Sequence, residues 1–172
     1  MKTYVSIFLI AVTMSAYTQD FSEEAKKKMA GFDFLVGEWE GEGWEMRGPE
    51  TRSTFTVKEQ VHYDLDSTIL VVRGKGEVTG GSSEKGHLAL AVISYDPFQR
   101  KLQLHSWIRQ GMNTKAQLEL KGENGFTWWF EAGPQTIRYT MILENGEWKE
   151  IGEFSKDSDT WIKFMEMRLR KK

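Results

Sequence analysis

The chain has 172 residues, of which 40% are hydrophobic and 28% charged, a composition typical of one globular domain and not of an extended disordered chain. Its formal net charge of −2 gives no general attraction for nucleic acid, so we expect no nucleic-acid partner. The absence of cysteine excludes disulfides, thiolate metal sites and a lipid-modified cysteine anchor.

Residues 1–18 predict a secretory signal peptide. Lys2 is basic, residues 4–12 are apolar, and residues 13–18 are small and polar. Cleavage after Thr18 would leave a single mature domain of residues 19–172, in the periplasm or outside the cell. The apolar run falls well short of the ~20 residues of a membrane-spanning helix, so no membrane anchor is expected. The alternative is a buried amino-terminal strand.

A short amphipathic helix is predicted directly after the cleavage site. Asp20 can cap it, and Gly31 can end it. Phe21, Ala25 and Met29 follow one another at intervals of four and form one apolar stripe. We expect this helix to plug or flank the sheet that follows.

From residue 37 onward the apolar period changes to two, which predicts strands. The turn signals Asn124-Gly125 and Asn145-Gly146 mark two hairpins, and connections this short make neighbouring strands antiparallel. The fold class is therefore all-β, an up-and-down sheet that closes into a barrel because closure removes exposed edges. About ten strands are expected, at 37–46, 52–63, 67–78, 86–95, 100–110, 114–121, 125–132, 135–144, 147–155 and 160–170.

Two of these strands are apolar on both faces, over residues 67–73 and 88–93. Such strands need cover outside the barrel. Either the amino-terminal helix or a second copy of the chain, forming a homodimer, would supply it.

Residues 35–43 (LVGEWEGEG) resemble the opening of the calycin barrels. The Gly-x-Trp is similar to the first-strand signature of the lipocalins, and the longer Leu-x-Gly-x-Trp-x-Gly-x-Gly to nitrobindin, a ten-stranded heme-binding barrel. Over nearly the whole mature chain the sequence resembles a bacterial family of exported proteins with no established activity, through residues 32–39, 89–96, 137–140 and 151–155. The resemblance implies a calycin-like, lipocalin-like barrel of about ten strands.

Trp39 is expected to plug the closed end of the barrel. The lipocalin resemblance implies that a basic residue near the end of the chain packs over this ring, and Arg168 or Arg170 could make that cation–π contact. This role is structural, and the competing role for Trp39 is contact with a ligand.

The resemblance to nitrobindin suggests heme as a cofactor. In nitrobindin the heme iron is held by a histidine late in the chain. The three histidines of this sequence are His62, His87 and His105, so none lies on the closing strands. Heme would need a different ligand such as methionine, and no cofactor is predicted. No histidine pair has metal-ligand spacing, so no metal site is predicted either.

Glu59 is the polar residue with the clearest indication that its side chain points into the barrel. It shares a predicted strand face with Phe55, Val57 and Val61, which would turn its carboxylate inward. A buried carboxylate is costly without a partner, and Arg73 on the next strand is the candidate. The pair would either orient a ligand or form an internal ion pair; a bulge could also expose this face.

A second candidate cluster is formed by His105, Trp107 and Arg109, which alternate on one strand face. Facing inward they would suit an anionic amphiphile, and facing outward they would be solvated. Trp129 follows Trp128 and Arg138 precedes Tyr139, so in each pair only one of the two side chains can face inward. The candidate ligand-binding residues are Glu59, Arg73, His105, Trp107, Trp129 and Arg138.

The predicted function is non-catalytic binding of a small, partly apolar molecule, anionic if the second cluster faces inward. No nucleophile elbow, phosphate loop or dinucleotide fingerprint is present, so no catalytic residues are assigned. The alternatives are an interaction or dimerisation module with a filled barrel, and an enzyme in which Glu59 and His105 act as an acid–base pair.

Overall fold

The structure, a computed structural model, describes residues 19–48, 51–79 and 86–172. The predicted signal peptide lies outside these residues. In the described part of the chain, no helix is long and apolar enough to cross a membrane.

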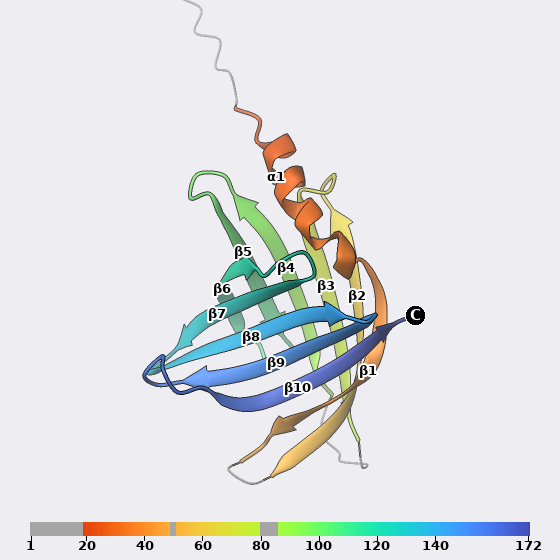
Figure 1. Cartoon of the computed structure of the whole chain (residues 1–172), viewed down its shortest axis with the longest axis vertical. Coiled ribbons are helices and arrows are strands. Elements are labelled where there is room, and N and C mark those ends of the chain that lie inside the picture. The colour runs from red at the N-terminus through yellow and green to blue at the C-terminus, as the bar shows by residue number, and fades with distance from the viewer. Residues whose placement is uncertain (1–18, 49–50, 80–85) are drawn as a thin grey trace, which may run out of the picture.

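Ten antiparallel strands form a closed barrel in which each strand pairs with its sequence neighbours and β1 pairs with β10 (Figure 1). The predicted all-β barrel of about ten strands is confirmed. The strands are β1 (Gly37–Met46), β2 (Arg52–Asp64), β3 (Ile69–Val78), β4 (Leu88–Asp96), β5 (Lys101–Ile108), β6 (Asn113–Leu120), β7 (Gly125–Ala132), β8 (Gln135–Glu144), β9 (Glu147–Ser155) and β10 (Ile162–Lys171).

The two hairpin signals have different outcomes. Asn145 and Gly146, with φ of 52° and 74°, form the turn between β8 and β9, as their shared tolerance of positive φ predicts. Asn124-Gly125 does not form the turn between β6 and β7. Gly125 already pairs with Ile142 in the sheet, and the positive φ of 64° falls on Gly122 instead.

The amino-terminal helix α1 (Ser22–Met29) continues without a break into a 3₁₀ helix, η1 (Ala30–Leu35). Gly31 therefore does not end the helix. A Cβ at Gly31 would lie 2.8 Å from Cδ1 of Leu120, so glycine here lets η1 approach the barrel wall closely. Asp20 accepts a hydrogen bond from the backbone N–H of Ser22 at 2.9 Å, while Phe21 occupies the capping position.

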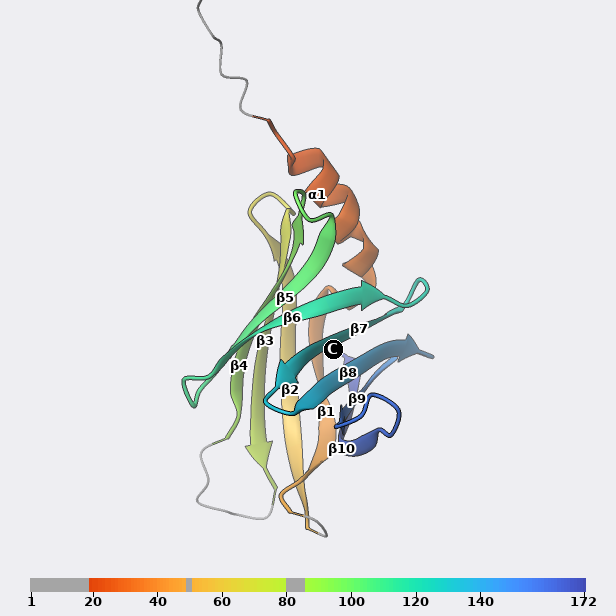
Figure 2. The same ribbon diagram turned by 90° about the vertical axis from the view of Figure 1, so that its left-hand side faces the viewer.

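Together α1 and η1 close one end of the barrel (Figures 1 and 2). The Tyr95 hydroxyl donates a hydrogen bond to Glu24 at 2.8 Å, and the Tyr63 hydroxyl donates to the backbone oxygen of Met29 at 2.8 Å. The ring of Phe32 packs edge-on against Phe126. The helical segment is thus fixed to both sides of the barrel opening.

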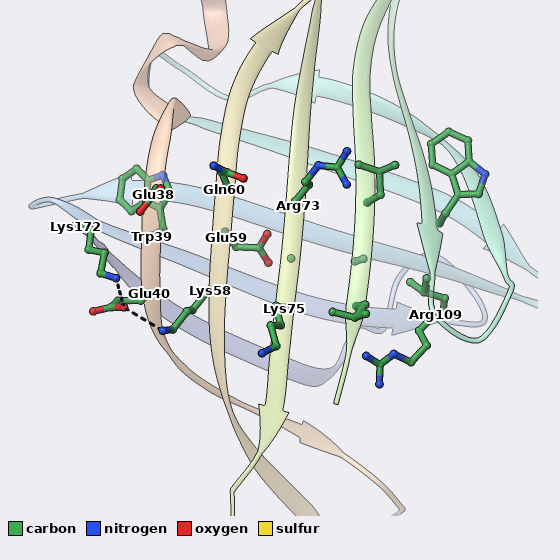
Figure 3. A pocket seen from close by; sticks show the side chains of 16 residues that line it. Glu38, Trp39, Glu40, Lys58, Glu59, Gln60, Arg73, Lys75, Arg109 and Lys172 are labelled. Carbon is green, nitrogen blue, oxygen red and sulfur yellow. Dashed lines mark ion pairs between the residues drawn. The ribbon is translucent and has the colours of Figure 1, made fainter. Parts of the chain in front are cut away.

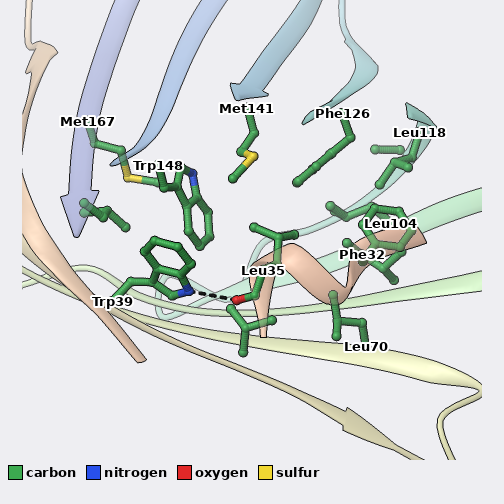
Figure 4. Packing of buried hydrophobic residues seen from close by; sticks show 14 of the residues in the cluster. Phe32, Leu35, Trp39, Leu70, Leu104, Leu118, Phe126, Met141, Trp148 and Met167 are labelled. Carbon is green, nitrogen blue, oxygen red and sulfur yellow. Dashed lines mark hydrogen bonds between the residues drawn. The ribbon is translucent and has the colours of Figure 1, made fainter. Parts of the chain in front are cut away.

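The hydrophobic core fills this same end (Figure 4). Trp39 is 2% exposed, packs edge-on against Trp148, and donates its indole N–H to the backbone oxygen of Leu35 at 2.7 Å. Other buried members of the core come from the helical segment and from strands all round the barrel: Phe32, Val61, Leu70, Ile93, Leu104, Leu118, Phe126, Met141, Met167 and Leu169. The core leaves the opposite end of the barrel available for a cavity.

Candidate functional site

A cavity of about 850 Å³ occupies the barrel interior beyond the core. Its volume lies within the roughly 300–1,000 Å³ typical of small-molecule sites. Gln110 and Met112 (61% exposed) follow β5 at the end of the barrel away from α1, and both line the cavity. The cavity therefore reaches solvent at that end.

Small residues on adjacent strands make room for this cavity. Its wall includes Gly74 and Gly76 of β3 and Ala89 and Ala91 of β4. The opposite wall is aromatic and carries Trp128, Tyr139, Trp148 and Phe164 among its lining residues. Small side chains facing large ones leave a hollow instead of a filled barrel.

Glu59 points into the cavity from β2, where it is directly opposite Gly74 of β3. Among the described residues, no group donates a hydrogen bond to its carboxylate or forms an ion pair with it. Burial, with a further contribution from the charge of Glu150, raises the pKa of Glu59 to about 8. An unpartnered carboxyl group in an apolar cavity is a candidate contact for a ligand.

Glu150 is the second interior carboxyl group and is 8% exposed. On β9 it lies between Met141 of β8 and Met167 of β10 in the strand register. Its Oε2 accepts a hydrogen bond from the indole N–H of Trp148 at 3.1 Å. Burial raises the pKa of Glu150 to about 7, against the lowering effect of this hydrogen bond.

Tyr139 adds a hydroxyl group to the aromatic wall. Its ring stacks on Trp128, with centroids 4.1 Å apart, and meets the edge of Phe164 at 5.7 Å. Burial, followed by the charges of Glu150 and Glu45, raises the pKa of Tyr139, so the phenol stays protonated. Within the described chain its hydroxyl has no hydrogen-bond partner and is available to a ligand.

Charged groups at the solvent end of the cavity are already engaged. Arg47 forms an ion pair with Glu45 at 2.6 Å. His87 also lines the cavity, and burial lowers its pKa. Among the described lining residues there are three glutamates and one arginine, so the interior is acidic.

Arg73 lies on the outside of the barrel, and the predicted ion pair with Glu59 is wrong. Across the β2–β3 pairing Arg73 is opposite Gln60, whereas Glu59 is opposite Gly74, so the two side chains leave opposite faces of the sheet. Arg73 lines an outer groove with Lys75 (Figure 3).

His105 and Trp107 also face outward. Their rings contact each other with centroids 4.2 Å apart, and Trp107 is 39% exposed. The residues that alternate with them, Leu104, Ser106 and Ile108, line the cavity. Of the two orientations left open for the cluster with Arg109, the structure thus has the outward one, and these candidate ligand contacts lie on the outer wall. Glu59 and His105 lie on opposite sides of the sheet and cannot act as an acid–base pair.

Trp129 and Arg138 are opposite each other on the outer face of β7 and β8. The Arg138 guanidinium forms an ion pair with Glu153 at 2.7 Å and lies 3.7 Å from the centroid of the Trp161 ring. These contacts give Arg138 a structural role on the surface. Their inward-facing neighbours Trp128 and Tyr139 line the cavity instead.

The residue that covers Trp39 is Lys171, whose Nζ lies 5.4 Å from the ring centroid. Strand pairing places Lys171 directly opposite Trp39, whereas Arg168 is opposite Glu42 and therefore faces outward. There Arg168 pairs with Glu147 at 2.9 Å and with Glu166 at 3.0 Å. The expected contact of Arg168 with Trp39 is wrong.

The polar cavity residues that were not among the sequence candidates include Tyr139, Glu150 and His87. Strand alternation carried a signal for two of them, since Tyr139 alternates with Met141 and Glu150 alternates with Trp148. No group of three or more potential metal ligands occurs among the residues that the structure describes.

Comparison with known proteins supports the fold. No protein-family model matches the chain, and no curated protein matches it in sequence. The S-type phycobiliprotein lyase CPES from Guillardia theta is similar in structure, with a TM-score of 0.60 over 90% of this chain and 99% of the lyase chain. At 9% sequence identity this similarity shows a shared calycin-like barrel.

Proposed function

We propose that this protein binds a small, mainly apolar molecule inside its barrel and does not catalyse a reaction. The proposal rests on the cavity of about 850 Å³ and on the carboxyl group of Glu59 on its wall, which has no hydrogen-bond or ion-pair partner among the described residues. A carboxyl group surrounded by apolar side chains has lost part of its hydration, and a ligand that donates a hydrogen bond would replace it.

The chemistry of the wall favours binding over catalysis. Aliphatic and aromatic side chains dominate the lining, and a few polar groups converge within it, as in small-molecule carrier sites. The similar lyase supports a calycin-like barrel for this chain, and its activity is not transferred at 9% identity.

The proposed ligand is not anionic. The basic candidates Arg73 and Arg138 lie on the outer wall, and Arg47, which lines the cavity, pairs with Glu45. An anion inside the barrel would meet Glu59 and Glu150 instead of a cation.

The proposal places this binding outside the cytoplasm, on the strength of the signal-like residues 1–18. The mass of the protein recovered from a bacterial periplasm or medium tests it. Cleavage after Thr18 is expected, and a protein that keeps Met1 and is found only in the cytoplasm would contradict export.

The binding proposal is tested on the purified mature protein by native mass spectrometry, solvent extraction and titration with the neutral fluorophore Nile red. Ala89→Phe should fill part of the cavity and weaken Nile red binding, because Ala89 lines it. Leu88→Phe is the matched control, since Leu88 is exposed on the other face of β4. Equal binding by both variants, or no extracted species and no Nile red binding, would reject the proposal.

A second candidate function is self-association through the outer wall. Leu88 and Trp107 are each 39% exposed, and Leu90 is directly opposite Trp107 in the β4–β5 pairing. These side chains form a small apolar surface that a second copy of the chain would cover. Light scattering over a range of concentrations tests it: a dimer that Trp107→Lys dissociates supports the candidate, and a constant monomer rejects it.

A further inference from the structure

We infer that the barrel selects organic cations, with an apolar body in the cavity and a protonated amine held by Glu59 and Glu150. This inference rests on the proposed binding function and assigns its ligand class. It also assigns Glu150 a direct role at the site, which its place in the core alone would not suggest.

The first argument is the distribution of charge. Glu59 and Glu150 both line the cavity, and the charge of Glu150 acts on Glu59. The described lining residues include no lysine, and Arg47 is held by Glu45 at 2.6 Å. Within the described chain, the inner part of the cavity thus has two acidic groups and no cationic side chain to neutralise them, and a ligand ammonium would do so.

The second argument is hydrogen bonding. Glu59 receives no hydrogen bond from the described residues, and Glu150 receives one, from the Trp148 indole. An ammonium group offers three donors and can therefore satisfy more than one acceptor in the cavity, whereas an alcohol offers one donor. Charge-assisted hydrogen bonds are also roughly twice as strong as neutral ones.

The third argument is the aromatic wall around the two acids. The Trp148 indole N–H donates a hydrogen bond to Glu150, and the stacked rings of Trp128 and Tyr139 line the same cavity. Aromatic faces attract cations, most strongly where water is excluded. Carboxylates combined with aromatic rings favour an amine over an alcohol or a carboxylic acid of the same shape.

Binding of a cation is also expected to depend on pH. The titratable and charged groups that face the cavity are Glu59, Glu150, Tyr139, Glu45, His87 and Arg47. Because burial raises the pKa of Glu59 and of Glu150, an ammonium ligand must displace a proton near neutral pH. Amine affinity should therefore rise between about pH 6 and pH 8, and alcohol affinity should change little.

The experiment compares three ligands of equal chain length, octylamine, n-octanol and octanoate, as competitors of Nile red and by direct calorimetry. We expect octylamine to bind at least about tenfold more tightly than n-octanol, and octanoate to bind most weakly. Glu59→Gln and Glu150→Gln should each reduce the preference for the amine by about tenfold while Nile red still binds. Glu40→Gln is the control, because Glu40 lies on the outer face with Lys58 and Lys172.

The outcomes separate the two proposals. If Nile red binds and the three competitors displace it equally, or if the glutamine variants keep the preference for octylamine, the cation inference is overturned and the binding function stands. If neither Nile red nor any of the three ligands binds by calorimetry, both are overturned. Circular dichroism and thermal melts establish that each variant is folded before it is scored.

Discussion

Glu59 of β2 and Gly74 of β3 are directly opposed in the barrel wall, and a Cβ at Gly74 would lie 2.6 Å from Oε1 of Glu59. The carboxyl group of Glu59 thus lies in the space that a side chain at position 74 would fill. Glycine at this position allows the carboxyl group to lie flat against β3 instead of extending further into the cavity.

Gly74→Ala is expected to displace the carboxyl group without unfolding the barrel, because the end of a glutamate side chain can move aside. Octylamine affinity should fall several-fold, measured by calorimetry. Gly76→Ala is the matched control on the same strand, where a Cβ would meet its nearest atom, Cβ of His87, at 3.4 Å. An equal loss of affinity in both variants would contradict a specific role for the Glu59–Gly74 contact.

Stability should fall as pH rises from about 5 to about 8. The pKa of Glu59 is raised to about 8 and that of Glu150 to about 7, from an ordinary value of 4.5, so over this range the folded protein holds protons that the unfolded chain has lost. The free energy of unfolding therefore decreases with pH, by at most about 1.4 kcal/mol per pH unit for each group.

Thermal melts at several pH values measure this decrease, and the control is the double variant Glu59→Gln with Glu150→Gln. Its stability should vary less over the same range. His87, whose pKa is lowered by burial, contributes the opposite trend below its ordinary pKa, but it is present in both proteins and cancels in the comparison. Parallel curves for the two proteins would show that the carboxyl groups are not perturbed.

Trp39→Phe should destabilise the fold by about 2–4 kcal/mol, because it removes buried ring area and leaves the Leu35 carbonyl without its indole donor. Urea unfolding followed by circular dichroism gives the free energy. The same exchange at Trp107, which is 39% exposed, should change it by less than about 0.5 kcal/mol. A small effect at Trp39 would mean that it does not plug the barrel.

Arg73→Gln and Arg138→Gln should leave Nile red and octylamine affinities within about twofold of the original protein, because both side chains lie outside the barrel. Arg138→Gln should cost at most about 1 kcal/mol of stability through its loss of contacts with Glu153 and Trp161. The same titrations and unfolding curves measure both effects. A large loss of binding in either variant would mean that the ligand binds on the outer wall and not in the cavity.

Much of the fold could be predicted from the sequence because its signals are local. Alternation of apolar residues defined the ten strands, and the Asn145-Gly146 turn followed from the tolerance of these residues for positive φ. Gly31 and Asn124-Gly125 were misjudged because tertiary contacts override local preference. Gly31 packs against Leu120, and Gly125 is already paired with Ile142.

The candidate site could be predicted only in part, because alternation places residues on two faces without saying which face is inside. For Glu59 the apolar neighbours Val57 and Val61 gave the correct face. For Arg73 the neighbours Ile69 and Val71 gave the wrong one, since its strand is apolar on both sides.

The sequence by itself thus determined the number of strands, their approximate ends and the inward direction of Glu59. Only the tertiary structure decided that Arg73 faces away from Glu59, that Lys171 and not Arg168 covers Trp39, and that Glu150 and Tyr139 line the cavity with Glu59. The reason is physical: a shift of one residue in strand register moves a side chain to the other face of the sheet, and register is fixed by closure of the whole barrel.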